Sequence, residues 1–547
     1  INSVLLRLFT TGNFKIRPLF FDLGMVIMFA MFSFFVKKNG KKAYYIVTSI
    51  IMIAICVINS IYYNYYSSFV SASLLATSVF VKDFGDVIVE FALNIRDWVY
   101  VWQLIGMILV IVKYSNREVN IKNNISIASI IVLVLFACGS IFPPYNSWSR
   151  LFKLWNRVAV VDSFGVYVYQ IDDLIQSLKP TFNNMFGYDS ALKDVTDYYN
   201  ENEKVFEVNE YTGIFEGKNV IAIHAESLQN FAIGLTINGQ EITPNINKLI
   251  KESLYFDNFY AQVGVGTSSD SEFTYATSLL PANNGTVFVN YYNNKFITMQ
   301  NLLNNKGYYV FSMHGNVGDF WNRNTMHQNM GYDKFYSKSS FIIDEEYGLG
   351  LSDVSFFKQV IPMIKDIDEN IGEPYYGTLI TLTNHTPWDD VDVYSNLDLS
   401  IPVTIDNEII LRDYLEDNVL GRYLKAINYM DSAIGLLMDG MEEEGLLDNT
   451  VIVIYGDHDA RISYRNYHDM YNYDLYEDRV MNEEDSLYKE FNEYDYEISK
   501  SVPLIIWSKD LEEGEVINTP MGMIDVLPTL GNMLNVYNKY SLGNDIM

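Results

Sequence analysis

The sequence contains little cysteine, little histidine and few basic residues. Its 547 residues include two cysteines and six histidines, and 67 acidic side chains outnumber 38 basic ones, giving a formal net charge of −29. Cys56 and Cys138 both lie within long apolar runs, which argues against a disulfide scaffold and against a cysteine-based zinc site. The lack of a basic footprint argues against a nucleic-acid partner.

Hydrophobic residues nevertheless make up 49% of the chain, so the charge must be unevenly distributed. The acids lie mostly after about residue 160, and four strongly apolar stretches precede that point. Each is close to the length of a membrane-spanning helix, with tyrosine and tryptophan near the ends as in interfacial belts. We predict a multi-pass α-helical membrane domain, against the alternative of buried helices in a soluble domain. The stretches are residues 20–36, 43–63, 98–112 and 125–142.

Two short basic loops predict the orientation of these helices. The positive-inside rule places both loops in the cytoplasm, so that residues 67–97 and everything after 142 lie outside. This topology also places residue 1 outside, from which we expect an earlier helix to be missing from this sequence. The loop residues are Lys37, Lys38, Lys41 and Lys42, and Lys113, Arg117 and Lys122.

The chain is too long for one core, and we predict three parts. Residues 1–143 form the membrane domain, residues 144–217 a linker with helices, and residues 218–547 an outer domain. In the outer domain apolar strands alternate with helical patterns, such as the helix expected to open on Thr243 and Pro244. This alternation predicts an α/β domain with a largely parallel central sheet flanked by helices.

Four apolar runs of the outer domain end in an acid or a histidine. In parallel sheets, ligands bind beyond the carboxyl ends of the strands, where these side chains would meet. A lone histidine at such a place is more often structural, but four polar-ended strands together indicate a site. Carboxylates and imidazole suit Mn²⁺, Mg²⁺ or Zn²⁺. The runs end at Glu226, at His314, at His385 and at Asp457-His458.

A segment rich in small and hydroxyl residues, Gly264–Phe273, follows the first run. It can present a hydroxyl nucleophile at a helix start. Ser269 and Glu272 also have the spacing of a capping box, which is compatible with that role. A metal beside such a hydroxyl would promote phosphoryl transfer through a covalent phospho-enzyme. His385 would then protonate the leaving alkoxide, and Arg323 would clamp the phosphate of an anionic substrate that the acidic domain otherwise repels.

Five segments taken in order give the chain a recognisable pattern. They are HAES (224–227), SDSEF (269–273), FWNR (320–323), TLTNH (381–385) and YGDH (455–458). With them, nearly the whole chain resembles the lipoteichoic acid synthase family of the sulfatase and alkaline phosphatase superfamily. The resemblance implies one divalent metal, with Mn²⁺ expected and Mg²⁺ or Zn²⁺ as alternatives. It implies the metal ligands Glu226, Ser268, Asp457 and His458, and a glycerolphosphate pocket lined by His314, Trp321, Arg323 and His385.

The chain departs from the family pattern at two positions. The family nucleophile is usually the Thr of a Gly-Lys-Thr-Ser-Asp run, and alignment on SDSEF puts Ser268 in that place and Thr267 where Lys is usual. We therefore expect Ser268 to be the nucleophile, with Thr267 as the alternative. Asn316 stands in the pocket where the family tends to have Asp, which removes one negative charge from glycerol recognition.

The resemblance also implies the reaction and its place. Phosphatidylglycerol would donate glycerolphosphate to a glycolipid-anchored acceptor, with release of diacylglycerol, at the cell membrane of a Gram-positive bacterium and with an extracellular catalytic domain. A phosphoethanolamine or other headgroup transferase, a primase that adds one unit, and a non-catalytic wall-binding scaffold are the alternatives. The sequence leaves open the oligomeric state and release of the outer domain by cleavage.

Overall fold

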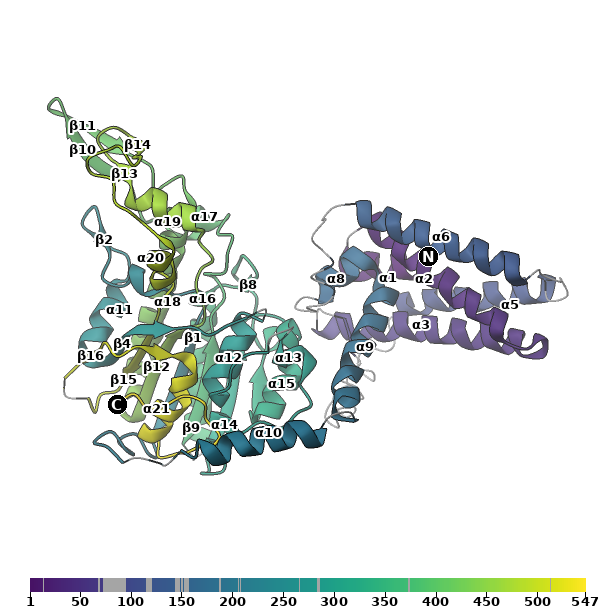
Figure 1. Cartoon of the computed structure of the whole chain (residues 1–547), viewed down its shortest axis with the longest axis horizontal. Helices are drawn as coiled ribbons and strands as arrows, with labels where there is room; N and C mark the ends of the chain where they lie inside the picture. The colour runs from purple at the N-terminus through teal and green to yellow at the C-terminus, as the bar shows by residue number, and fades with distance from the viewer. Residues whose placement is uncertain are drawn as a thin grey trace. The chain divides into compact units, whose positions relative to one another are not determined.

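A computed structural model shows that the chain forms two compact units (Figure 1). Unit 1 comprises residues 1–191, 289–292 and 317–325, and unit 2 comprises residues 192–288, 293–316 and 326–547. The predicted boundaries at 143 and 217 stay predictions. The structure describes residues 1–12, 14–66, 69–71, 95–114, 121–142, 148, 151, 157–185, 188–204, 206, 208–264, 266–282, 286–371, 374–511 and 513–547.

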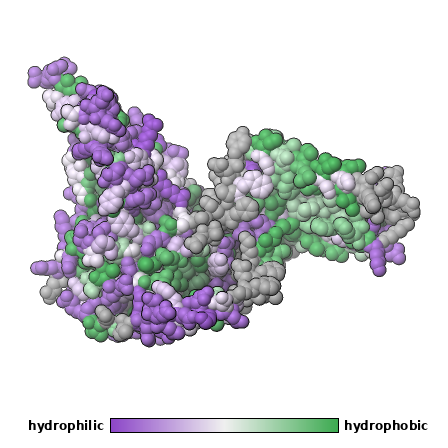
Figure 2. Space-filling model, in the orientation of Figure 1, coloured by the Kyte–Doolittle hydropathy of each residue, from purple (hydrophilic) through white to green (hydrophobic). Residues whose placement is uncertain are grey.

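Unit 1 is helical, and much of its surface is hydrophobic (Figure 2). Among the residues that the structure describes, three helices are long and apolar enough to span a membrane, over Arg17–Phe35, Lys41–Tyr63 and Asn124–Ile141, and Trp98–Lys113 is a shorter apolar helix. The predicted stretches therefore correspond to three candidate spans and one shorter helix. Arg117 and most of 67–97 lie outside the described residues, and the orientation stays a prediction. The helices are α1 (Asn2–Thr10), α2 (Arg17–Phe32), α3 (Lys41–Tyr66), α5 (Trp102–Tyr114), α6 (Ile121–Ile141), α8 (Arg157–Phe164) and α9 (Val166–Met185).

Residues 317–325 belong to unit 1 and are held there by buried polar contacts. Arg157 on α8 forms an ion pair with Asp319 at 3.0 Å, and both side chains are at most 5% exposed. The Tyr62 hydroxyl donates to the same Asp319 oxygen at 2.7 Å, and Arg157 donates to the Asn322 side chain at 3.0 Å. Trp321 and Asn322 have φ angles of 58° and 60°, a left-handed backbone that persists only where surrounding contacts hold it.

Unit 2 is built on a nine-stranded sheet with the order β16-β4-β15-β12-β1-β9-β5-β6 and β17 beside β4. Every pairing is parallel except those of β15 with β12 and β4, which confirms the largely parallel sheet and adds one antiparallel strand. The strands are β1 (Asn219–Ala225), β4 (Ser253–Tyr260), β5 (Tyr309–His314), β6 (Lys334–Tyr336), β9 (Tyr375–Ile380), β12 (Thr450–Gly456), β15 (Val502–Trp507), β16 (Glu515–Ile517) and β17 (Met521–Gly522).

The central strands are buried on both faces, as their apolar runs predict. Every residue of β1, β9 and β12 is buried, and alternate residues such as Ile221 and Ile223 join the core formed with α16 and α18. The expected helix after Thr243 is α11, with Pro244 at its first position. The main helices are α10 (Tyr188–Glu201), α11 (Pro244–Leu249), α12 (Ser268–Thr277), α14 (Met299–Asn304), α15 (Arg323–Met330), α16 (Asp353–Ile371), α18 (Val419–Glu443) and α21 (Val526–Met533).

Replacing Arg157 by Met should destabilise unit 1 strongly, because it leaves the Asp319 carboxylate buried without its cation. Removing one partner of a buried ion pair costs about 3–5 kcal/mol. Thermal unfolding of the full-length chain in detergent should show a clear drop in Tm. Lys193→Met is the control, since Lys193 and Asp197 form an exposed pair with side chains 76% and 51% exposed. Equal shifts in the two variants would show that the buried pair contributes no more than a surface one.

Candidate metal and nucleophile site

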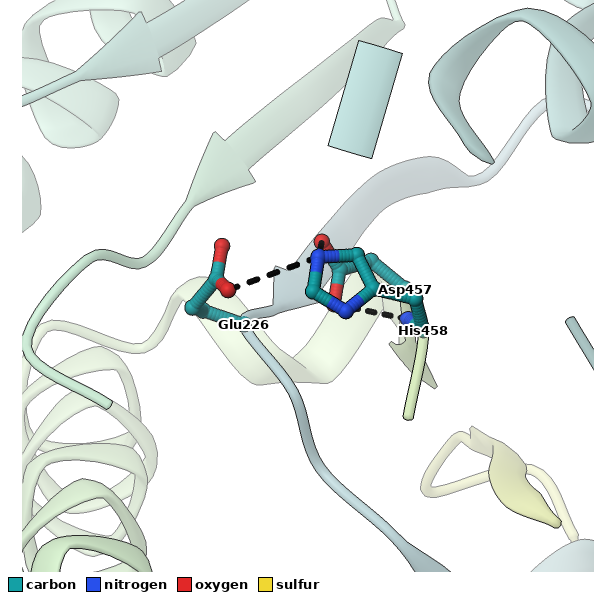
Figure 3. Close-up of side chains that lie close together, drawn as sticks. All are labelled: Glu226, Asp457 and His458. Carbon is teal, nitrogen blue, oxygen red and sulfur yellow. Dashed lines mark hydrogen bonds and ion pairs between the residues drawn. The ribbon is translucent and has the colours of Figure 1, made fainter. Parts of the chain in front are cut away.

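Two neighbouring parallel strands deliver the candidate metal ligands. In the register of β1 and β12, Ala225 lies opposite Gly456, so the chain leaves the sheet at Glu226 and Asp457 at the same level. His458 follows directly. Figure 3 shows the three side chains converging on one point. The predicted meeting of strand ends therefore occurs for Glu226, Asp457 and His458.

The three side chains have the geometry of a divalent cation site. One ligand atom from each lies within 4.8 Å of the others, and all three residues are buried. His458 Nε2 lies 3.5 Å from Glu226 Oε1 and 3.3 Å from Asp457 Oδ2. Two buried carboxylates facing each other across one imidazole need a positive charge between them. The donor set of two carboxylates and one imidazole therefore fits a divalent metal.

Charge in this cluster shifts the pKa of two groups in opposite directions. Burial alone would raise the pKa of Asp457, but His458 and His224, together with hydrogen bonds from the His224 ring and the Ser227 amide, hold it below its usual range. Burial alone would lower the pKa of His458, but the neighbouring Asp457 and Glu226 carboxylates raise it above 6.5. Only the neutral imidazole of His458 can bind a metal, so a proton on that ring competes with the metal.

Ser268 is the first residue of α12 and lies beside this cluster. Its Oγ is 3.3 Å from His458 Nε2 and 3.5 Å from Glu226 Oε2, and the residue is 6% exposed. Thr267 is the residue just before the helix, with φ 44° and ψ −109°. The structure thus brings Ser268 together with three of the expected ligands.

The capping-box interpretation of Ser269 and Glu272 is wrong. Helix α12 begins after Thr267 with no side-chain cap, and the Ser269 hydroxyl donates to the Gly266 carbonyl instead. Glu272 lies 2.7 Å from His327 Nε2, and the other ring nitrogen of His327 lies 2.9 Å from Ser312 Oγ. This buried contact ties the helix that carries Ser268 to β5.

His224 supports the metal ligands and was not singled out from the sequence. Its Nε2 lies 3.0 Å from Asp457 Oδ2, and its Nδ1 lies 2.9 Å from the Tyr455 hydroxyl. His224 stands two residues before Glu226, a spacing at which the side chains of a strand share a face. That spacing is the signal that could have identified His224. Carboxylates that bind a metal are commonly oriented by such a hydrogen bond.

The TLTNH loop after β9 is fixed by Asp353, which stands at the start of α16. The carboxylate accepts from the amides of Leu382 and Thr383 at 2.8 and 3.2 Å, and the Thr383 hydroxyl accepts from the Asp353 amide at 2.9 Å. Burial raises the pKa of Asp353 to about 7. His385, at the end of the loop, is partly exposed and its Nδ1 lies 2.7 Å from the Thr386 carbonyl.

The remaining predicted residues fall into both units. His314 ends β5 with Nδ1 3.1 Å from the Ile380 carbonyl, and Asn316 follows it, buried in unit 2. Trp321 and Arg323 are buried in unit 1. Their shared role in one pocket stays a prediction.

Comparison with known proteins gives a family for both parts of the chain. The sulfatase family model matches residues 218–536, and the model of the lipoteichoic acid synthase N-terminal domain matches residues 8–186. The chain is 30% identical over 535 residues to lipoteichoic acid synthase 2 of Bacillus subtilis, covering 96% of this chain and 77% of that protein. It is also 30% identical over 544 residues to lipoteichoic acid synthase 1 of the same organism, covering 97% and 80%.

A solved structure agrees with these sequence relationships. The crystal structure of the lipoteichoic acid synthase LtaP from Listeria monocytogenes superposes with a TM-score of 0.54 at 26% identity, covering 65% of this chain and 81% of that one. The chain therefore belongs to the lipoteichoic acid synthase family and is an enzyme of the sulfatase-like phosphoglycerol transferase class.

Proposed function

We propose that the protein takes glycerolphosphate from phosphatidylglycerol through a covalent Ser268 intermediate and polymerises it into lipoteichoic acid, releasing diacylglycerol. The observation that carries this proposal is the Ser268 hydroxyl, buried beside two carboxylates and an imidazole in a chain of this family. The membrane helices of unit 1 support a lipid donor, because its headgroup is reached at a bilayer surface.

In the first half-reaction, Ser268 Oγ reacts as the alkoxide that a cation in the cluster would stabilise, forming a bond to phosphorus while the bond from phosphorus to the diacylglycerol oxygen breaks. Glu226, Asp457 and His458 would hold a divalent cation, which lowers the pKa of a nearby hydroxyl and withdraws charge from phosphate. We assign His385 as the acid that gives its proton to the leaving diacylglycerol oxygen. The partly exposed ring at the end of a fixed loop suits that exchange.

In the second half-reaction, the terminal hydroxyl of the acceptor glycolipid chain gives its proton to His385 and attacks phosphorus, and Ser268 Oγ leaves as the alkoxide, which restores the starting state of both residues. The bonds are made and broken in the reverse order of the first half. One histidine can therefore act as the acid in the first half and as the base in the second. We assign contacts with the glycerol and phosphate groups to His314 and Asn316, which belong to the same unit as Ser268. The roles expected of Trp321 and Arg323 stay predictions.

Mn²⁺ is the metal that we propose, with Mg²⁺ and Zn²⁺ as alternatives. Mg²⁺ strongly prefers all-oxygen coordination, and the set here includes the His458 nitrogen. The catalytic unit acts on the outer face of the cell membrane, where the donor lipid and the acceptor glycolipid are both presented.

Replacing Ser268 by Ala should abolish diacylglycerol release, because the attacking oxygen is removed. Full-length protein in vesicles with fluorescent phosphatidylglycerol and Mn²⁺ provides the assay, and Thr267→Ala is the matched variant. Loss of diacylglycerol release in Thr267→Ala, with full activity in Ser268→Ala, would show that Thr267 is the nucleophile. Turnover of phosphatidylethanolamine in place of phosphatidylglycerol by the parent would contradict the proposed donor.

The products of the same reaction separate a polymerase from a primase. With glycolipid acceptor present, we expect a ladder of species that differ by one glycerolphosphate unit, because the acceptor end is regenerated after each transfer. Gel or mass analysis of the lipid products reads this directly. A single added unit at all reaction times would show that the enzyme primes the chain and does not extend it.

Mn²⁺ affinity should rise with pH and level off above the raised pKa of His458, because the metal competes with a proton for the ring. Below that pKa the affinity should change about tenfold per pH unit. Isothermal titration calorimetry of the full-length protein between pH 6 and 8 measures this dependence. His458→Gln should remove the steep part of the curve. His468 pairs with Asp469 and is not part of the cluster, so His468→Gln should keep it. An equally flat curve for the parent would argue against His458 as a ligand.

A further inference from the structure

The turn in front of α12 holds Thr267 in a conformation that side chains rarely adopt. Its φ of 44° and ψ of −109° lie in the region that favours glycine. Such a backbone persists only where neighbouring groups hold it, and it is enriched at functional sites. The next residue is Ser268, so whatever holds this turn also sets the position of the nucleophile proposed above.

The Asp270 carboxylate is the group that closes the turn. Its Oδ2 accepts hydrogen bonds from the amides of Gly264 and Gly266 at 3.0 and 2.8 Å. Asp270 is completely buried, and burial raises its pKa while the two amides oppose that shift. A carboxylate buried among backbone amides is tolerated because the hydrogen bonds replace water.

Gly266, Ser269 and Thr286 pack closely around this carboxylate. A Cβ atom at Gly266 would lie 2.3 Å from Asp270 Oδ1 and 2.6 Å from Thr286 Oγ1, so only glycine allows the close approach. The Ser269 hydroxyl donates to the Gly266 carbonyl at 2.9 Å, and its oxygen lies 2.9 Å from Thr286 Oγ1. Two side chains therefore hold the turn: Asp270 binds the amides of Gly264 and Gly266, and Ser269 binds the Gly266 carbonyl.

The same turn starts the helix. The Thr267 carbonyl accepts from the amides of Asp270 and Ser271 at 3.0 and 2.9 Å, and the Gly266 carbonyl accepts from Ser269. The Asp270 carboxylate therefore binds the turn that precedes the helix, while the Asp270 amide donates one of the first hydrogen bonds of the helix, to the Thr267 carbonyl. Its hydrogen bonds go to the turn amides, whereas Ser268 Oγ is directed at His458.

We propose that Asp270 is a positioning residue that holds Thr267 in its unfavourable conformation and so places Ser268 Oγ beside the Glu226, Asp457 and His458 cluster. The proposal rests on the proposed function of Ser268 as the nucleophile. Asp270 acts through the turn and makes no bond to the reacting phosphate.

Asp270→Ala should lower kcat by about 100-fold at saturating Mn²⁺, because a nucleophile misplaced by about 1 Å loses that much rate. The KM for phosphatidylglycerol and the calorimetric affinity for Mn²⁺ should stay close to the parent values, since Glu226, Asp457 and His458 are untouched. Asp270→Asn should retain most of the activity, because one amide oxygen can still accept both hydrogen bonds. Gly266→Ala should lower kcat in the same way, because the added Cβ would displace the Asp270 carboxylate.

Asp431 offers a matched control. It is also a fully buried carboxylate, and it accepts from the amides of Asn245 and Ile246 at 3.0 and 2.8 Å at the start of α11. Asp431→Ala should lower the Tm much as Asp270→Ala does while keeping the parent kcat. Equal effects on kcat in the two variants would overturn the positioning role and leave only a structural one.

Thr267→Gly, introduced into Asp270→Ala, tests the strain directly. Glycine adopts the turn conformation without being held, so the double variant should recover at least part of the lost kcat, with Thr267→Gly alone completing the cycle. No recovery would contradict the proposal, as would a parent-like kcat in Asp270→Ala. If Asp270→Ala does not fold, Gly266→Ala and the Asp270→Asn rescue carry the same test. Failure of the proposed function itself is distinguished by Ser268→Ala remaining active.

Discussion

The organisation of the catalytic unit depends on two carboxylates buried at the ends of adjacent parallel strands. Glu226 and Asp457 leave β1 and β12 at the same level, where each would repel the other in the absence of a cation. The protein keeps this pair by surrounding it with partners: His458 lies between them, His224 holds Asp457, and the Ser227 amide donates to the same carboxylate at 2.7 Å. A divalent metal held by these residues would complete that balance of charge.

Ser268, the proposed nucleophile, reaches this charged cluster from a separate element that is fixed from several directions. All ten residues of α12 are buried, its start is closed by Asp270 and its middle is tied to β5 through Glu272 and His327. A hydroxyl at the first position of so constrained a helix loses little further freedom during the reaction. Positional precision of this kind is a large contributor to rate in two-step transfers.

Much of the fold and the metal cluster could be predicted from the sequence because both depend on local patterns. Apolar runs that end in Glu226, His314, His385 and Asp457 identify buried parallel strands and the edge at which their ends meet. The antiparallel direction of β15 could not be predicted, since an apolar run has the same pattern in either direction.

Contacts between residues distant in sequence could not be predicted either. Glu272 and His327 are 55 residues apart and their spacing contains no pattern, so a local capping box was the simpler interpretation. A buried histidine within a strand, such as His224, resembles an ordinary core residue until its partner is known. The positive φ at Thr267 could not be predicted from the sequence either, because threonine is not a residue that indicates such a backbone.

A covalent glycerophosphoryl group on Ser268 can be detected by rapid acid quenching followed by peptide mass spectrometry. Full-length protein would be mixed with phosphatidylglycerol and Mn²⁺ without acceptor, then quenched and digested. We expect one glycerophosphoryl adduct on the peptide that contains Ser268, assigned to that serine by fragmentation. Diacylglycerol release without any adduct, or an adduct assigned to another residue, would contradict it.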